Sequence, residues 1–186
     1  QWPHTPMGET TNLPLAVDLD GTLILTDMSR VTIRRVVLPR PWLIPYLLIL
    51  ELMRKRARWK RVLGQRLKFD PAELEYHTEF LAWLKQQKAT GREIILCTAS
   101  EMCVAEKIAA HVGLFDDVMA SDGITNLRME AKGEALAARY GKGGFAYAGN
   151  SSHDLKTWPF AGEVIVVNAS QRTRSQLGDR PSLVFE

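Results

Sequence analysis

The stretch Leu15-Ala16-Val17-Asp18-Leu19-Asp20-Gly21-Thr22 places two carboxylates directly after a short apolar run. The apolar residues predict a buried strand, and the polar residues predict the loop at its end. Residues two apart on an extended chain point to the same side, so Asp18 and Asp20 repel each other unless a cation or a shared proton relieves them. A surface Asp-Gly turn would explain Gly21 but not a charge at the end of an apolar strand. The pair therefore favours a divalent metal site.

Further apolar runs of strand length follow, separated by segments with helical patterns. The strand-like runs are 93–97, 117–120, 145–148 and 164–167, and the helical candidates are about 71–89, 101–112, 130–140 and 152–161. Alternating strands and helices predict a parallel sheet covered by helices, because right-handed crossovers place successive strands in the same direction. The expected fold class is α/β, a Rossmann-like three-layer fold with a central parallel sheet.

One interval is too long for this simple alternation of strands and helices. The segment between Asp20 and Thr98 is more than twice the length of the roughly 30 residues that form a strand–helix–strand unit. The surplus, residues 24–70, predicts a small helical cap inserted after the first strand, with helices near 42–53 and 59–67. Residues 1–23 and 71–186 would then form the α/β core.

The composition is that of a globular domain with room for a core, since 46% of the 186 residues are hydrophobic and 24% are charged. The net charge of +3 gives no reason to expect a nucleic-acid partner. Two cysteines are too few for a disulfide scaffold, so we expect a reducing cytoplasm. We expect no signal peptide, and the first dozen residues have the composition of a polar tail.

Residues 42–66 combine an apolar run with a basic cluster. The run at 42–53 is interrupted by Pro45 and Glu51 and is shorter than the roughly 20 residues that span a bilayer. The cluster at 54–66 contains no acidic residue. Two interpretations remain open. The apolar side chains pack over the active site as a lid while the basic ones are solvated, or the segment lies in a membrane interface beside anionic lipids.

Two further groups of polar residues lie at the end of the run 93–97 and at the start of the helix expected over 130–140. Thr98-Ala99-Ser100 stands before the helix expected from about residue 101, where a hydroxyl and free backbone N–H groups form an anion site. Ordinary helix capping by Ser100 would use the same residues. Lys132 lies just inside the helix expected from residue 130, and taken alone it is an ordinary surface charge.

The last polar group of this kind follows the run 145–148. Asn150 and Asp154 offer oxygen ligands four residues apart in Gly149-Asn150-Ser151-Ser152-His153-Asp154, which suits a hard cation such as Mg²⁺. His153 in the same loop reads as an exposed histidine at the start of a helix. Ligands in open parallel sheets bind outside the carboxyl ends of the strands, so these strand-end residues are expected to meet.

In chain order these residues form a DxDGT strand end, a Thr strand end, a Lys and a GNSxxD turn. This pattern resembles the motifs of the haloacid dehalogenase-like superfamily, and the resemblance covers nearly the whole chain. It implies a Rossmann-like core and an enzyme that hydrolyses phosphoric monoesters with Mg²⁺. Asp20 argues for phosphate chemistry, because the dehalogenases of the superfamily lack an acid at this place.

The resemblance also implies a role for each matching residue. Asp18 would attack phosphorus to form an aspartyl-phosphate, and Asp20 would act as general acid and then as general base. Thr98, Ala99 and Lys132 would bind the phosphate group of the substrate.

The implied Mg²⁺ ligands are Asp18, Asp20 through its carbonyl oxygen, Asn150 and Asp154. Many members of the superfamily carry Asp where this chain has Asn150. The amide oxygen still ligates a hard cation, but one negative charge is lost, so weaker metal affinity is expected.

A narrower resemblance rests on the strings at 146–151 and 120–127. They resemble the haloacid dehalogenase-like domains that precede UbiA-type prenyltransferases in bacteria. This implies a small-molecule or lipid-linked phosphate ester, a location in the cytoplasm or at the cytoplasmic face of the inner membrane, and contact with the membrane or a prenyltransferase domain through residues 42–66. It leaves an alternative function open, that of a catalytically weak phosphate- or membrane-binding module that regulates a prenyltransferase partner.

Overall fold

Six parallel strands form the central sheet of the computed structural model, which describes residues 12–186; the expected polar tail lies almost wholly outside that range. The strands are β1 (Leu15–Val17), β2 (Ile94–Glu101), β3 (Asp117–Ser121), β4 (Ala146–Gly149), β5 (Glu163–Val167) and β6 (Pro181–Phe185), in the order β3-β2-β1-β4-β5-β6. The order reverses at β1, which makes the end of β1 the topological switch point where ligands bind in such sheets. The expected α/β fold class is confirmed.

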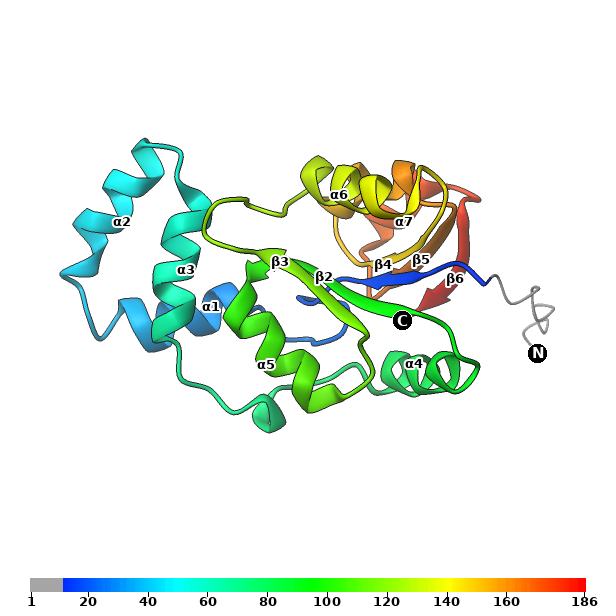
Figure 1. Ribbon diagram of the computed structural model, residues 1–186, viewed down its shortest axis with the longest axis horizontal. Helices are drawn as coiled ribbons and strands as arrows, with labels where there is room; N and C mark the ends of the chain where they lie inside the picture. The colour runs from blue at the N-terminus through cyan, green and yellow to red at the C-terminus, as the bar shows by residue number, and fades with distance from the viewer. Residues whose placement is uncertain (1–11) are drawn as a thin grey trace.

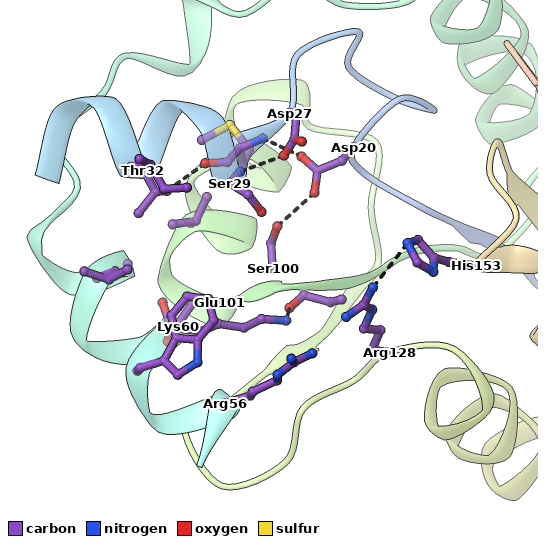
Figure 2. A pocket seen from close by; sticks show the side chains of 17 residues that line it. Asp20, Asp27, Ser29, Thr32, Arg56, Lys60, Ser100, Glu101, Arg128 and His153 are labelled. Atoms are coloured by element: carbon purple, nitrogen blue, oxygen red, sulfur yellow. Dashed lines mark hydrogen bonds between the residues drawn. The ribbon is translucent and has the colours of Figure 1, made fainter. Parts of the chain in front are cut away.

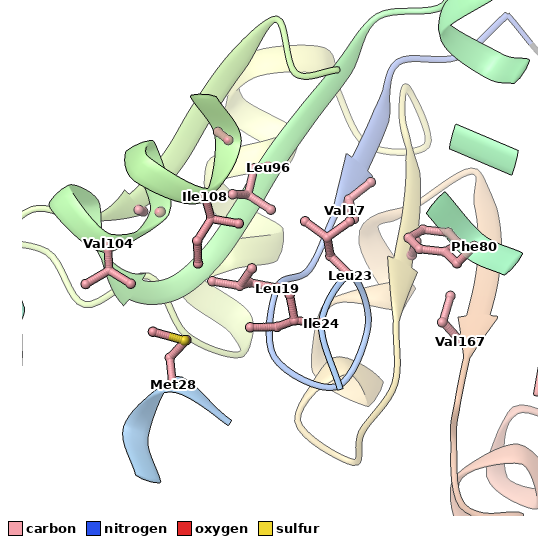
Figure 3. Packing of buried hydrophobic residues seen from close by; sticks show 14 of the residues in the cluster. Val17, Leu19, Leu23, Ile24, Met28, Phe80, Leu96, Val104, Ile108 and Val167 are labelled. Carbon is pink, nitrogen blue, oxygen red and sulfur yellow. The ribbon is translucent and has the colours of Figure 1, made fainter. Parts of the chain in front are cut away.

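Helices cover both faces of the sheet, as Figure 1 shows, with α4 and α5 on one side and α6 and α7 on the other. Their bounds are α4 Thr78–Ala89, α5 Met102–Val112, α6 Glu130–Tyr140 and α7 Gln171–Leu177. Alternate strand residues face the two layers: Val17 and Leu96 pack with Phe80 and Ile108 on one face (Figure 3), whereas Tyr147 packs with the α6 and α7 side. A sheet buried on both faces explains the continuous apolar runs of the sequence.

The segment between β1 and α4 lies beyond the carboxyl ends of the strands (Figure 1). It contains α1 (Met28–Thr32), a π-helical stretch Ile33–Val37, α2 (Leu43–Leu52), α3 (Arg56–Arg66) and a 3₁₀ turn Pro71–Glu73. Helix α3 packs on α5 and on the ends of β2 and β3, so this segment stands over the polar end of the sheet. The division into a core and a cap at residues 24 and 70 stays a prediction.

Several elements differ from expectation. The helix expected over 152–161 is two 3₁₀ turns, Asp154–Lys156 and Trp158–Phe160, because Pro159 cannot donate the backbone hydrogen bond that an α-helix needs. The helix expected over 71–89 begins only at Thr78, after the 3₁₀ turn. Strand β2 runs through the Thr98–Ser100 loop to Glu101, with a register shift after Cys97.

Candidate active site

The chain turns sharply after β1 and presents two carboxylates. The Asp18 N–H extends the sheet by donating to the Ala148 carbonyl at 3.0 Å, and Gly21 takes the left-handed conformation with φ of 73° that completes the turn. Asp20 is held from two sides: Oδ1 accepts from the Met28 N–H at 2.8 Å and Oδ2 from the Ser100 hydroxyl at 3.1 Å. Both carboxylates are therefore fixed at the switch point, with distinct partners.

Lys132 lies at the centre of a buried network with Asp18. Its Nζ atom donates to Asp18 Oδ1 at 2.9 Å and to the Tyr147 hydroxyl at 3.0 Å, and it lies 4.0 Å from Asp154 Oδ1. The Tyr147 hydroxyl donates in turn to Asp154 Oδ1 at 2.6 Å. Helix α6 and strands β1 and β4 thus bring these side chains together from distant parts of the chain.

Burial and mutual repulsion set the protonation of these carboxyl groups. Burial raises the pKa of Asp18 to about 7. The ammonium of Lys132 lowers this pKa, and repulsion from Asp154 raises it. Burial also opposes the charged form of Lys132, but Asp18 and Asp154 outweigh it and raise the pKa of that ammonium. Burial raises the pKa of Asp20 as well. The site therefore contains two carboxyl groups whose pKa is raised by burial, one of them paired with a cation.

Asp154 is anchored by the loop that follows β4. Its Oδ2 atom accepts from the backbone N–H groups of Asn150 and Ser151 at 2.9 and 3.0 Å. The Asn150 side chain lies against Gly21, so close that a β-carbon on Gly21 would be 2.1 Å from its amide nitrogen. Gly21 therefore makes room for the Asn150 side chain at the turn that follows Asp20.

The expected phosphate-binding residues lie at the end of β2. Thr98 is buried and its hydroxyl accepts from the Ser100 N–H at 3.0 Å. The Ala99 carbonyl accepts from Lys60 Nζ at 2.9 Å and from the Ser121 hydroxyl at 2.8 Å. Capping by Ser100 is wrong: Glu101 caps α5 with its own carboxylate, because the strand continues one residue further, and Ser100 is left to contact Asp20.

The oxygen atoms present fit a magnesium ion. Asp18 and Asp154 lie close enough to share one ammonium, and the repulsion between them is the kind that a divalent cation relieves. Within residues 12–186 no three His, Cys, Asp or Glu side chains gather into a metal-binding group. Two carboxylates offer the hard oxygen ligands that Mg²⁺ prefers, and this ion keeps several of its waters when bound.

A cavity of about 440 Å³ opens beside Asp20. Figure 2 shows Asp20 and Ser100 on one side of it, with Lys60 across from them and the contacting pair Arg128 and His153 at its edge. The cavity is therefore bounded both by the sheet end and by α3 of the inserted segment.

Comparison with protein families matches residues 15–158 to the haloacid dehalogenase-like hydrolases. The match includes every strand-end residue described above. The chain belongs to this family of hydrolases. The resemblance inferred from the strand-end motifs is confirmed, whereas the narrower likeness to prenyltransferase-linked domains stays a prediction.

The hydrolase has a curated relative in Sinorhizobium fredii, the uncharacterized protein y4nM, with 31% identity over 172 residues. The match covers 89% of this chain but 32% of the relative, so the hydrolase spans about a third of that protein's length.

Solved structures share its fold. A Bordetella pertussis protein of unknown function superposes with a TM-score of 0.67 at 17% identity, covering 93% of this chain and 97% of that one. A substrate-bound phosphoserine phosphatase superposes with a TM-score of 0.62 at 17% identity, covering 96% and 94%. A phospho-aspartyl intermediate analogue of phosphoserine phosphatase gives 0.59 at 16% identity, covering 94% and 93%.

Four residues at the hydrolase site were not predicted as catalytic, metal-binding or phosphate-binding residues from the sequence. Tyr147 sits inside an apolar strand run, where a tyrosine reads as core, and Ser100 read as a helix cap. Lys60 was noted only as part of the basic cluster at 54–66, because only the folded inserted segment brings it to the cavity, and Arg128 was not singled out. The cluster of basic residues at 54–66 drew attention to the inserted segment, but it did not indicate that Lys60 would face the cavity.

Proposed function

We propose that this chain is a Mg²⁺-dependent phosphoric monoester hydrolase that forms an aspartyl-phosphate on Asp18. The observation that carries the proposal is the separate anchoring of two carboxyl groups at one strand end. Asp18 is paired with Lys132 at 2.9 Å, whereas Asp20 is held by Met28 and Ser100. A nucleophile and an acid are both available, and a phosphate-binding module would need neither.

The residues divide the reaction into two steps. A carboxylate oxygen of Asp18 attacks phosphorus while Asp20 donates its proton to the leaving oxygen; the deprotonated Asp20 then takes a proton from the water that attacks the aspartyl-phosphate. The raised pKa of Asp20 suits this alternation. The Met28 N–H and the Ser100 hydroxyl hold the Asp20 carboxyl in position through both steps.

Thr98, the Ala99 N–H and Lys132 would bind the oxygens of the phosphoryl group. Thr98 and Lys132 are buried, so their interactions with developing negative charge are stronger than in water. Lys132 also keeps Asp18 oriented, and Tyr147 fixes Lys132.

Asp18, the Asp20 carbonyl, Asn150 and Asp154 would hold Mg²⁺. The ion would neutralise charge on the phosphoryl oxygens and on the clustered carboxylates. Because Asn150 stands where a further carboxylate would add charge, we expect an enzyme with a comparatively high Mg²⁺ requirement.

The test is a screen of phosphorylated metabolites with Mg²⁺, comparing the wild-type chain with Asp18→Asn. We expect turnover of a phosphate ester by the wild type and loss of at least about 10³-fold in the variant. Absence of turnover on every ester, with a normally folded protein, would favour the alternative of a catalytically weak module that regulates a prenyltransferase partner.

A second proposal concerns attachment to an anionic membrane through α2. Its exposed side is apolar: Leu52 is 84% exposed and Trp42 69%, and Leu48, Ile49 and Met53 are more than half exposed. No helix in the described range is long and apolar enough to cross a bilayer. Apolar side chains beside the exposed cations Arg54, Lys55 and Arg58 fit the interface of an anionic membrane, where a lipid-linked phosphate ester would be within reach.

Vesicle sedimentation tests this attachment. We expect stronger pelleting with anionic than with neutral vesicles, and loss of pelleting in Leu48→Ser/Leu52→Ser but not in Val184→Ser, which lies on strand β6. Equal pelleting with both vesicle types would overturn the electrostatic part. Full pelleting of the Leu48→Ser/Leu52→Ser variant would overturn the assignment of membrane binding to α2. A protein partner would then be the remaining occupant of the exposed apolar side of α2.

A further inference from the structure

Two cations line the cavity beside Asp20 without an acidic partner. Lys60 of α3 donates to the Ala99 carbonyl at 2.9 Å and to Asn126 Oδ1 at 2.7 Å, both neutral acceptors. Arg128 contacts His153 Nε2 at 3.2 Å. Within residues 12–186, neither cation forms an ion pair with a carboxylate.

The two cations act on each other. Burial first, and then the charge of Arg128, lower the pKa of Lys60 to about 8. Burial and then Arg128 also lower the pKa of His153, whose Nε2 atom lies 3.2 Å from the Arg128 guanidinium. Like charges brought together in a half-buried cavity repel, and an anion placed between them relieves the repulsion.

The backbone fixes Arg128 in its position. The Arg128 N–H donates to the Asn126 carbonyl at 2.9 Å, and the next residue, Met129, has a φ of 52°. A non-glycine residue in this conformation is strained and persists only where its surroundings hold it, here by the Thr157 hydroxyl bonded to the Met129 carbonyl. Asn126 therefore contacts both residues, because its side chain accepts from the Lys60 ammonium and its backbone carbonyl accepts from the backbone N–H of Arg128.

No acidic side chain of the cavity lies within ion-pair distance of Lys60 or Arg128 in the described residues, although the charge of Asp20 acts on Lys60 and opposes the lowering of its pKa. Arg56 is paired with Glu51 at 2.6 Å, and Glu101 is paired with Arg61 at 3.4 Å. The Asp20 carboxylate is already hydrogen-bonded to Met28 and Ser100. The remaining wall combines apolar side chains (Met28, Ile33, Trp59, Leu63 and Val104) with the polar residues Asp27, Ser29 and Thr32. Asp27 pairs with Arg30 at 3.9 Å.

We propose that Lys60 and Arg128 form a subsite for a second oxyanion of the substrate, a carboxylate or a second phosphate. The substrate class is then a phosphoric monoester whose organic part carries another anionic group, bound away from the phosphate that is removed. The proposal rests on the proposed phosphatase function for the position of the first phosphate. Arg128 recognises the second oxyanion through its planar donor fork, and Lys60 acts as a point charge.

Binding to the Asp18→Asn protein tests the subsite without need of turnover. Calorimetry with Mg²⁺ compares n-alkyl phosphates with ω-carboxyalkyl phosphates and alkane bisphosphates of the same chain length. We expect at least one ligand with a second anionic group to bind about tenfold tighter than the alkyl phosphate of the same chain length. We expect this preference to fall below about twofold in Lys60→Gln and in Arg128→Gln.

Lys85→Gln and Arg172→Gln are the matched controls, since both residues are exposed on helices outside the cavity, and they should keep the full preference. Arg128→Gln alone remains decisive if Lys60→Gln loosens α3. No preference at any chain length, or a preference that survives in Arg128→Gln, would overturn the subsite. Absence of turnover in the wild-type enzyme would instead contradict the proposed function.

Discussion

The Tyr147 hydroxyl joins Asp154 to Lys132, with a 2.6 Å hydrogen bond to Asp154 Oδ1 and a 3.0 Å bond from Lys132 Nζ. Burial raises the pKa of Tyr147 well above its ordinary value, so this hydroxyl stays protonated and keeps donating to the carboxylate. A single phenol thus orients one proposed metal ligand and one proposed phosphate-binding residue.

Replacing this phenol tests its positioning role. Tyr147→Phe removes a donor from Asp154 and an acceptor from Lys132, so we expect Mg²⁺ affinity or activity to fall by about 10–100-fold. The measurement is the Mg²⁺ concentration at half-maximal activity. Tyr140→Phe is the control, because Tyr140 donates to Glu93 at 2.8 Å outside the site. If the two variants behave alike, Tyr147 is only a core residue.

Asp20 is tested by separating the two chemical steps. Asp20→Asn removes the proton donor and the later base, and we expect alkyl phosphate turnover to fall by about 10²–10⁴-fold. With p-nitrophenyl phosphate, whose leaving group needs no proton, we expect a stoichiometric burst of nitrophenolate followed by slow turnover. Asp27→Asn is the control, because Asp27 lines the same cavity but caps α1. A variant without a burst would contradict the assignment of Asp20 to both steps.

The strand-end residues were predictable because apolar runs determine where each strand stops. Asp18, Thr98 and Asp154 follow such runs, and a parallel sheet must bring these ends to one edge. Strand β6 was not predicted, since it begins with Pro181 and lies at the sheet edge with alternating exposure. Helix α7 was also missed, because only Thr173 and Leu177 of its residues are buried.

The cavity wall was beyond sequence reasoning for a different reason. Whether Lys60 faces solvent or the active site depends on how α3 packs on α5 and β2, and that packing is tertiary. The position of Arg128 depends on the strained backbone at Met129, which no propensity indicates.

Lys60 predicts a dependence of substrate preference on pH. Its folded-state pKa of about 8 lies below the ordinary 10.5 because of burial, Arg128, Arg56 and Lys132, with Asp20 acting in the opposite direction. Lys60 is therefore charged below pH 8 and neutral above it. We expect the advantage of esters with a second anionic group to be largest at low pH and to decline through pH 8. The measurement is the ratio of the KM of the alkyl phosphate to the KM of the ester with the second anionic group, from about pH 6 to 9.5.

Lys60→Arg provides the control for that titration. A guanidinium stays charged throughout this pH range, so the preference should no longer decline near pH 8. The same decline in Lys60→Arg and in the wild type would assign the titration to another group.

Gly21 predicts a steric coupling to Asn150. Gly21→Ala places a β-carbon 2.1 Å from Asn150 Nδ2 at a φ of 73°, whereas Gly91→Ala has a φ of 85° with open space around it. We expect both variants to lose about 1–2 kcal/mol of unfolding free energy through backbone strain, and only Gly21→Ala to raise the Mg²⁺ requirement several-fold. Denaturant unfolding and Mg²⁺ titration of activity measure the two effects. An unchanged Mg²⁺ requirement would remove Asn150 from the proposed metal site.

The covalent step on Asp18 is the centre of this account. The most direct measurement is acid quenching of the working enzyme with an isotopically labelled phosphate ester, followed by borohydride reduction and peptide mass spectrometry. The predicted result is a labelled acyl-phosphate whose reduction converts residue 18 to homoserine. Steady turnover with no trapped phosphate, or with label on another residue, would contradict it.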